Sequence, residues 1–427
     1  MRELVILRNC QEYDSESIRE IIAQGIKELG IKPKEKVFIK PNGVFVSPYA
    51  YTHPAVIKGL VLYLKGLGVE RIILGEDSGL MVPTRYVFER TGYKRLSKEM
   101  GFDCMFMDEV KRDTLIDIPD GVVHKKLKLP RAFVDSFRIY LPKLKTHFQT
   151  QISCASKLAM GICDRRERLL GHHYKLEEKI VDLLKGGFPE LIIVDSIVMG
   201  IGSAGSPLPY PLGLLIMGKN PIAVDSVASH ILSLNPEDIP HLRIGHHRGY
   251  GPINLEDIEI RGDITLEEAK KRALGWKKRV PKIDKVRLFI GRTPYVDRCP
   301  GGCFGFAEES ILFIESFRKR RPDRFIDRVI RWILGSRKRK IGLVLGDYKG
   351  KIPEDIEEIL LIGDCAKVDY NGRKRRIKGC PVYMGRQVWW ISKLSGLPNP
   401  WLDRREAFSF IKNSILKAIK LFLPTLP

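Results

Sequence analysis

The chain has 427 residues and a mass of 48.7 kDa, which corresponds to two or three domains of ordinary size. Hydrophobic residues make up 44% and charged residues 29%, values typical of a folded globular protein, so disordered and collagen-like chains are excluded. Lys and Arg number 73 against 51 Asp and Glu, giving a formal net charge of +22. Such an excess favours an anionic partner: nucleic acid, a membrane surface or a phosphorylated or carboxylated ligand.

Targeting signals are not evident in the sequence. No run of about 18 apolar residues is present, so we expect no transmembrane helix. The N-terminal segment lacks a long apolar stretch with a small-residue cleavage site, so we expect a cytoplasmic protein, whose cysteines tend to be reduced, metal-bound or catalytic. Five Gln beside many Lys, Arg, Glu and Ile are typical of a thermophilic source.

Strand and helix patterns alternate along the first part of the chain. We predict strands at 3–8, 37–40, 71–74, 102–107, 137–141, 191–194 and 214–217, and helices at 15–29, 54–67, 150–160 and 223–232. Residues 199–211, rich in Gly and Pro, are predicted to be a loop, and edge strands at 256–261 and 286–290 are predicted around a basic helix near 265–278. The alternation predicts an α/β fold: a parallel-sheet, Rossmann-like core with helices on both faces.

A second region is predicted to begin near residue 295. It contains a basic amphipathic segment (307–340) and two short strands (341–345 and 358–362), and we expect a smaller α/β region that carries cysteines. The predicted division is a core domain over 1–290, a cysteine-containing region over 291–400 and an amphipathic tail over 401–427. The helix predicted at 405–423 can lie on a bilayer interface or cap the core, and we favour capping.

Polar residues cluster in loops that follow predicted strands. These loops span 40–43, 75–79, 142–147, 195–205 and 218–221. Ligands on open parallel sheets bind beside the carboxyl ends of the strands, so we expect the loops to meet around a small anionic ligand. The side chains predicted to converge on it are Lys40, Asn42, Lys143, Lys145, His147 and Lys157. Simple solvation of lysines that follow strands is the alternative.

Carboxylates and histidines near these loops have supporting roles in this prediction. Asp77, Asp195 and Asp225 can hold a metal ion or orient the lysines. His172 can supply a metal ligand or an acid–base group, and a surface turn is the alternative for it. We predict Lys145, His147 and Lys157 as catalytic residues, and Lys40, Asn42, Asp77, Lys143, His172, Asp195 and Asp225 as ligand-binding residues.

An ordered set of short motifs carries a family resemblance. The motifs lie at 38–42, 141–147, 157–161, 165–172, 192–195 and 220–225. Together they resemble the domain of unknown function 362 family over about 35–250. The resemblance implies a link with iron–sulfur proteins, because many members carry ferredoxin-like cysteine runs, but it settles no activity. Leu158 stands where the family usually has Asn after the lysine, which implies a different ligand or the loss of that step.

Four cysteines in the second region form the predicted metal site: Cys299, Cys303, Cys365 and Cys380. Four thiolates suit a 4Fe-4S cluster and also tetrahedral zinc, and disulfides or free thiols are a third alternative. The segments at 363–366 and 378–381 resemble the cluster-binding segments of hydrogenase small subunits. Gly before and Pro after Cys380 favour iron–sulfur, whereas the other four cysteines lie in or near apolar segments and are predicted to be core residues.

Basic segments in the second region predict an acidic partner. Residues 317–340 contain eleven Lys or Arg and two Asp, a net charge of +9, in an amphipathic pattern typical of a membrane-surface or acidic-partner helix. The basic run 373–376 lies between the last two cysteines, where it can raise a cluster's reduction potential and dock an acidic electron-carrier protein. A solvated face is the plain alternative. We do not expect nucleic-acid binding, since no known motif of that kind is present.

These patterns predict an iron–sulfur redox protein that binds a small anionic ligand in its N-terminal domain. If the protein is an enzyme, we expect an oxidoreductase, since the sequence has no convincing nucleophile triad, Walker A loop or Gly-x-Gly-x-x-Gly fingerprint. The alternative is a non-enzymatic, zinc-stapled basic module for a membrane surface or nucleic acid.

Overall fold

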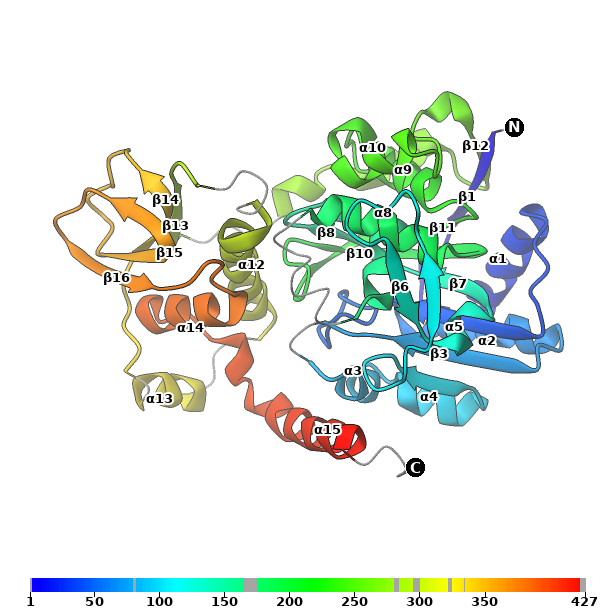
Figure 1. Cartoon of the computed structure of the whole chain (residues 1–427), viewed down its shortest axis with the longest axis horizontal. Coiled ribbons are helices and arrows are strands. Elements are labelled where there is room, and N and C mark those ends of the chain that lie inside the picture. Colours follow the sequence, from blue (N-terminus) through cyan, green and yellow to red (C-terminus); the bar gives the residue numbers. More distant parts are fainter. Residues whose placement is uncertain are drawn as a thin grey trace.

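Two β-sheets organise the computed structural model, which describes residues 2–79, 82–164, 175–279, 284–294, 300–321, 325–333 and 335–422. A large sheet with its helices forms the N-terminal part, and a smaller sheet lies in the C-terminal part (Figure 1). Helix α12 (Gly305–Arg320) lies between the two parts and contacts both of them.

The large sheet has ten strands. Its main path is β12 (Ile258–Gly262), β1 (Glu3–Asn9), β11 (Leu208–Gly218), β10 (Leu191–Ile201), β7 (Phe137–Leu141), β2 (Lys36–Pro41), β3 (Arg71–Glu76) and β4 (Asp103–Phe106). The short strands β8 (Lys143–His147) and β9 (Gln151–Ser153) attach beside β10. All neighbours on the main path are parallel except β11, which runs antiparallel to β1 and β10.

Helices cover both faces of the large sheet, because the apolar side chains of its buried strands point to both sides. One face packs against α1 (Ser15–Glu28), α2 (Pro54–Gly66), α3 (Thr84–Arg90) and α4 (Tyr93–Met100). The other packs against α5 (Arg131–Val134), α6 (Ala155–Leu158), α8 (Leu176–Gly187), α9 (Pro221–Ile231), α10 (Pro240–His247) and α11 (Leu266–Ala273). The predicted α/β class, with a mostly parallel sheet between helices, is therefore confirmed.

The smaller sheet is parallel throughout. Its order is β13 (Val286–Ile290), β14 (Ile341–Tyr348), β15 (Glu358–Val368) and β16 (Arg373–Ile377). Helices α12 and α14 (Met384–Ser395) pack on its apolar core, and the chain continues through α13 (Phe325–Ile333) and ends in α15 (Arg404–Phe422). The predicted boundary after residue 290 is corrected, because β13 pairs with β14 and belongs to the C-terminal sheet.

Shorter elements complete the chain. A two-stranded antiparallel hairpin consists of β5 (Thr114–Asp117) and β6 (Lys126–Leu129). Single helical turns span Ala159–Ile162, Pro236–Asp238, Leu255–Asp257, Trp276–Arg279, Pro300–Phe304 and Pro400–Leu402.

Two local predictions are wrong. The helix expected at 150–160 is instead β9, the short helix α6 and a single 3-10 turn. The loop expected at 199–211 is shorter and spans 202–207, since β10 and β11 continue as an antiparallel ladder that pairs Ile201 with Leu208. Tertiary pairing supplies the hydrogen bonds here and overrides the local turn composition.

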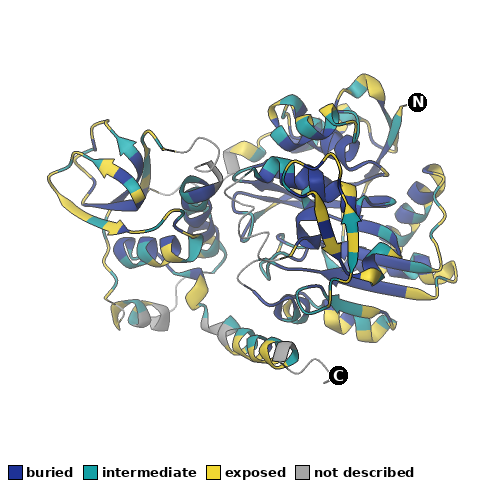
Figure 2. Cartoon of the chain, in the orientation of Figure 1, coloured by how far each residue is buried: buried dark blue, intermediate teal, exposed yellow. Residues whose placement is uncertain are grey.

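The C-terminal helix covers a small apolar cluster through Phe410, which packs against Val82, Tyr86 and Val87, so the predicted capping is found in part. Other apolar side chains of the helix face solvent: Phe408 is 80% exposed and Ile415 is 55% exposed. Figure 2 shows exposed residues along α15. In the part of the chain that the structure describes, no helix has the length and apolar character that crossing a bilayer would require.

Candidate functional site

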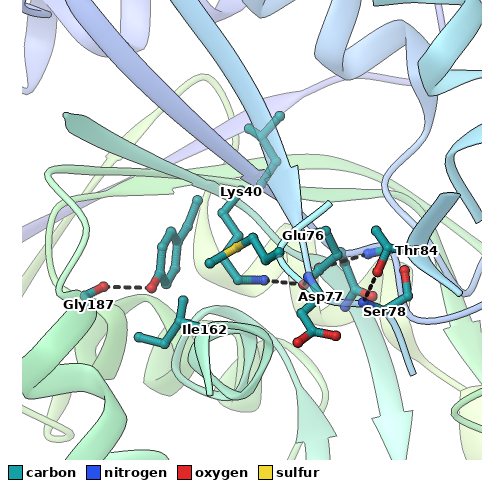
Figure 3. Close-up of polar contacts among 12 residues, drawn as sticks. Lys40, Glu76, Asp77, Ser78, Thr84, Ile162 and Gly187 are labelled. Atoms are coloured by element: carbon teal, nitrogen blue, oxygen red, sulfur yellow. Dashed lines mark hydrogen bonds and ion pairs between the residues drawn. The ribbon is translucent and has the colours of Figure 1, made fainter. Parts of the chain in front are cut away.

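The first part of the candidate site is a buried ion pair at the carboxyl ends of β2 and β3. The Lys40 amine lies 2.7 Å from Glu76 Oε1, and both side chains are almost fully buried. Glu76 also accepts the backbone N–H groups of Gly43 and Asp77. Figure 3 shows Lys40 directed at Glu76. Burial raises the pKa of Glu76, and these donors oppose the rise. Gly161 lies directly against the pair, where a side chain would not fit.

A second buried ion pair lies at the ends of β7 and β10. Lys143 Nζ is 2.9 Å from Asp195 Oδ1 and donates to the Tyr13 hydroxyl at 2.8 Å. The Tyr13 hydroxyl in turn donates to Asp195 Oδ1, and the His53 backbone N–H donates to Asp195 Oδ2. Burial lowers the pKa of Lys143, and Asp195 opposes this change. Asp195 therefore orients a lysine, one of the two roles predicted for it.

Lys145 lies between these pairs, on β8. Its amine contacts three oxygen atoms: Ala50 O at 2.9 Å, Ala204 O at 3.1 Å and Asn42 Oδ1 at 3.5 Å. Three acceptors match the three hydrogens of an ammonium group. Burial, followed by repulsion from Lys157, lowers the pKa of Lys145 to about 7. The charged and neutral forms of this amine are therefore both accessible near neutral pH.

Asp225 positions the segment that carries Lys157. Its carboxylate accepts the backbone N–H groups of Ala155 and Ser156 at 2.7 and 2.9 Å, at the start of α6. Burial raises the pKa of Asp225 to about 6, because these bonds offset only part of the desolvation. In the structure, then, Asp225 holds the α6 backbone.

Asp77 and His147, which were also predicted as site residues, contact groups other than the lysines described above. Asp77 forms an ion pair with Arg112, and His147 Nδ1 accepts the backbone N–H groups of Gln149 and Thr150. His147 thus shapes the turn after β8. His172 lies outside the described residues.

Sequence reasoning missed a carboxylate that reaches this site from the C-terminal part. Glu309 on α12 is buried and accepts the Ser203 hydroxyl at 2.6 Å and the backbone N–H groups of Ala204 and Gly205 at 3.1 and 3.2 Å. Ala204 is also an acceptor of Lys145. No local pattern identifies Glu309, because its partners lie more than 100 residues away in the chain. Glu76 was detectable, since it directly follows a predicted strand.

The second part of the candidate site is a cavity of about 90 Å³ in the C-terminal part. Its lining includes Cys303, Cys365 and Cys380, which come from the turn before α12, from β15 and from the segment after β16. The lining also includes Gly302, Gly346, Gly363 and Gly379. Three of the four cysteines of the predicted metal site, although far apart in the chain, thus line one cavity. Cys299 lies outside the described residues.

Backbone donors and cations surround these thiols. The Val382 N–H donates to Cys303 Sγ at 3.1 Å, and Gln387 donates to the Cys303 carbonyl. The Arg376 guanidinium holds the Gly363 and Ala366 carbonyls beside Cys365. No disulfide joins two of the described cysteines, and no group of three or more His, Cys, Asp or Glu among the described residues is arranged to hold a metal ion.

The basic run predicted near the last two cysteines forms strand β16. This strand is an edge of the smaller sheet, and most of its side chains are exposed. Cys380 follows it and is exposed, whereas Cys303 and Cys365 are half-buried. The thiol cavity thus opens beside a positively charged edge.

Comparison with known proteins finds a family match within the N-terminal part. Residues 37–230 match the family model described as "Domain of unknown function (DUF362)", which agrees with the resemblance noted in the sequence. The chain is also 25% identical over 273 residues to a thylakoid-associated protein of Synechocystis sp., in an alignment that covers 60% of this chain and 83% of the relative.

Similarity to solved structures is weak. The lactate racemase apoprotein of Thermoanaerobacterium thermosaccharolyticum superposes with a TM-score of 0.36 and 13% identity, covering 50% of this chain and 54% of that one. A protein from Thermotoga maritima gives a TM-score of 0.32 and 13% identity, with coverage of 79% and 72%. Scores this low support no statement about function.

Proposed function

We propose that this protein carries a 4Fe-4S cluster bound by Cys299, Cys303, Cys365 and Cys380 and works in electron transfer. The main support is the cavity shared by three thiols that belong to separate elements. In a 4Fe-4S cluster each iron takes one thiolate, so ligands spread around the walls of a cavity suit a cluster. Cys299 is the fourth ligand in this proposal and precedes Cys303 by four residues.

The surroundings of the thiols fit the chemistry of such a cluster. Cluster sulfurs are stabilised by N–H donors, and Val382 already donates to Cys303 Sγ. Gly363 and Gly379 both have positive φ, a conformation that favours glycine and lets the backbone turn closely around a bound group. When bound, the cluster would supply one-electron redox chemistry.

The charge around the cavity favours an acidic electron-carrier protein as the redox partner. The exposed residues Arg373, Lys374 and Arg376 lie on β16 and Arg386 lies on α14. Their charges would stabilise the reduced cluster and attract an acidic protein surface. Exposure of Cys380 leaves a short path from the cavity to such a partner.

The lysine cluster of the N-terminal part is the proposed site for a small anionic ligand. Four lysines (Lys40, Lys143, Lys145 and Lys157) lie among buried carboxylates (Glu76, Asp195, Asp225 and Glu309), of which Glu76 and Asp195 lie 2.7 and 2.9 Å from a lysine amine. Lys145 is the residue we expect to attract the ligand, because the acceptors of its amine are neutral oxygens, whereas Lys40 and Lys143 each form an ion pair. Lys145 can then hold or release a proton near neutral pH, which suits a catalytic role.

Anaerobic purification with iron and sulfide analysis tests the cluster. We expect a brown protein with broad visible absorption and about four irons per chain. Cys365→Ser should lose iron and colour, whereas Cys104→Ser should keep both, because Cys104 lies on β4 in the other part of the chain. A colourless protein with one zinc per chain would contradict the redox proposal and favour the zinc-stapled module.

A further inference from the structure

Helix α15 turns its polar side toward the protein. Glu89 on α3 accepts Ser409 at 3.0 Å, Lys412 at 2.7 Å and Asn413 at 3.3 Å. Farther along the helix, Lys417 forms an ion pair with Asp108. The helix is therefore attached to the N-terminal part through hydrogen bonds and ion pairs, and also through Phe410, whose ring lies edge-on to Tyr86 with the centroids 5.5 Å apart.

The apolar side of α15 faces away from the protein. Its members are spaced three or four residues apart, so they form one stripe about 17 Å long. Their exposed fractions are 80% for Phe408, 57% for Ile411, 55% for Ile415 and 42% for Ile419. An exposed stripe of this size is uncommon on a soluble surface and indicates a binding face.

A second apolar group lies at the end of α13. Trp332 is 80% exposed and Ile333 is 69% exposed. Helices α13 and α15 both lie along the lower edge of the view in Figure 1, and Figure 2 shows exposed residues on both helices. We call the exposed apolar residues of α13 and α15, taken together, the α13–α15 face; that both groups reach one bilayer surface is part of the proposal below.

Cations belong to the same helices and to the segment that follows α13. Arg328 and Arg331 lie on α13, and Lys420 lies near the end of α15. Lys338 is exposed, whereas Arg337 and Arg339 form ion pairs with Glu358 of the smaller sheet. A basic helix with an exposed Trp and large aliphatic residues is the composition that binds in the headgroup layer of an anionic bilayer.

We propose that the α13–α15 face docks on the surface of an anionic lipid bilayer. A second copy of this chain is a poorer occupant, because a symmetric dimer through this face would bring the two sets of cations together. Phe408, Ile411, Ile415 and Trp332 enter the headgroup layer, and the cations contact lipid phosphates. This inference is independent of the proposed cluster.

Vesicle flotation of the full chain tests the proposal. We expect binding to vesicles of phosphatidylcholine mixed with phosphatidylglycerol, much weaker binding to phosphatidylcholine alone, and release at high salt. The double variant Phe408→Ser/Ile415→Ser should bind about tenfold or more weakly, since two large side chains no longer enter the bilayer. Leu274→Ser is the matched control, because Leu274 is 71% exposed and lies outside the α13–α15 face.

Two further measurements distinguish weaker vesicle binding from unfolding of the variant and from dimerisation of the chain. Thermal melting should be similar for the double variant and the control, since all the substituted side chains are exposed. Light scattering should give a monomer for the wild type without lipid. Equal vesicle binding by the double variant and the wild type would overturn the proposal, and so would a wild-type dimer that the double variant converts to monomers.

Discussion

Lys145 is the residue whose chemistry depends most on its surroundings. Its amine is buried among three oxygen acceptors, and the loss of water on burial, followed by repulsion from Lys157, lowers its pKa from 10.5 to about 7. A lysine in this range can act as an acid or a base at neutral pH, whereas an exposed lysine remains charged.

The depressed pKa of Lys145 predicts a pH dependence of stability. Between about pH 7 and 10.5 the unfolded chain holds a proton on this amine that the folded chain has released. The unfolded state binds more protons, so this group adds stability as pH rises, by at most about 1.4 kcal/mol per pH unit. Urea unfolding at several pH values should show this slope in the wild type and its loss in Lys145→Met.

Lys128→Met is the control for this measurement, because Lys128 is exposed on β6. Its free energy of unfolding should follow the wild-type pH slope. Parallel curves for the wild type and Lys145→Met from pH 7.5 to 9 would contradict a depressed pKa.

At the same scale, the sequence predicted the lysines better than their partners. Lys40 and Lys143 could be selected because each lies at or just after the end of a predicted strand of the sheet. Glu76 and Asp195 lie 36 and 52 residues farther along the chain, so only the strand order shows which carboxylate meets which lysine. Glu309 could not be found at all, since its contact depends on how α12 meets the N-terminal part.

At the scale of elements, α12 is attached to the N-terminal part by Glu309. The carboxylate is the acceptor of the Ser203 hydroxyl and of two backbone N–H groups in the loop between β10 and β11. Glu309→Ala would leave these donors without this acceptor, which costs about 1–3 kcal/mol for each group left unsatisfied. Ala204 and Gly205 are half-buried, so water can replace the acceptor for part of this set, and we expect a total loss of about 2–4 kcal/mol in the free energy of unfolding, measured by urea denaturation.

Glu308→Ala is the matched control on the same helix. Glu308 takes no part in the three bonds to residues 203–205, so its removal should cost well under about 1 kcal/mol. Similar losses for the two variants would show that Glu309 does not anchor α12.

Helices and strands whose apolar residues recur at regular spacing were predicted well, and segments without such spacing were not. Helix α1 begins at Ser15 as expected, because Asp14 caps it and its apolar residues recur at helical spacing. The helix predicted at 150–160, after β8, was wrong because the apolar residues of this segment are buried by long-range packing around α6 and not by a helical face. The apolar stripe of α15 was correctly seen as a helix, but a period alone cannot say whether the stripe meets a core or a membrane.

At the scale of the whole molecule, α12 joins the two candidate sites. Cys303 lies just before its first residue, and Glu309 lies one to two turns farther along, against the loop that contacts Lys145. The sequence predicted two regions, but it gave no information on this connection, because the contact joins segments that are far apart in the chain. The helix is a physical link through which a bound metal group can affect the lysine cluster.

This link predicts that loading of the cysteine site, if it occurs as proposed, stabilises the N-terminal loop at residues 203–206. A bound metal group would hold Cys303 in place and so order the start of α12. Glu309 would then extend this ordering to the loop through its three hydrogen bonds. Hydrogen exchange should be slower in the metal-loaded chain than in the metal-free chain, both at 303–310 and at 203–206.

In Glu309→Ala, loading should still slow exchange at 303–310 but no longer at 203–206, whereas Glu308→Ala should behave as the wild type. Slower exchange confined to 303–310 in the wild type would mean that the two sites work independently, since the hydrogen bonds of Glu309 would then hold the parts together without coupling them.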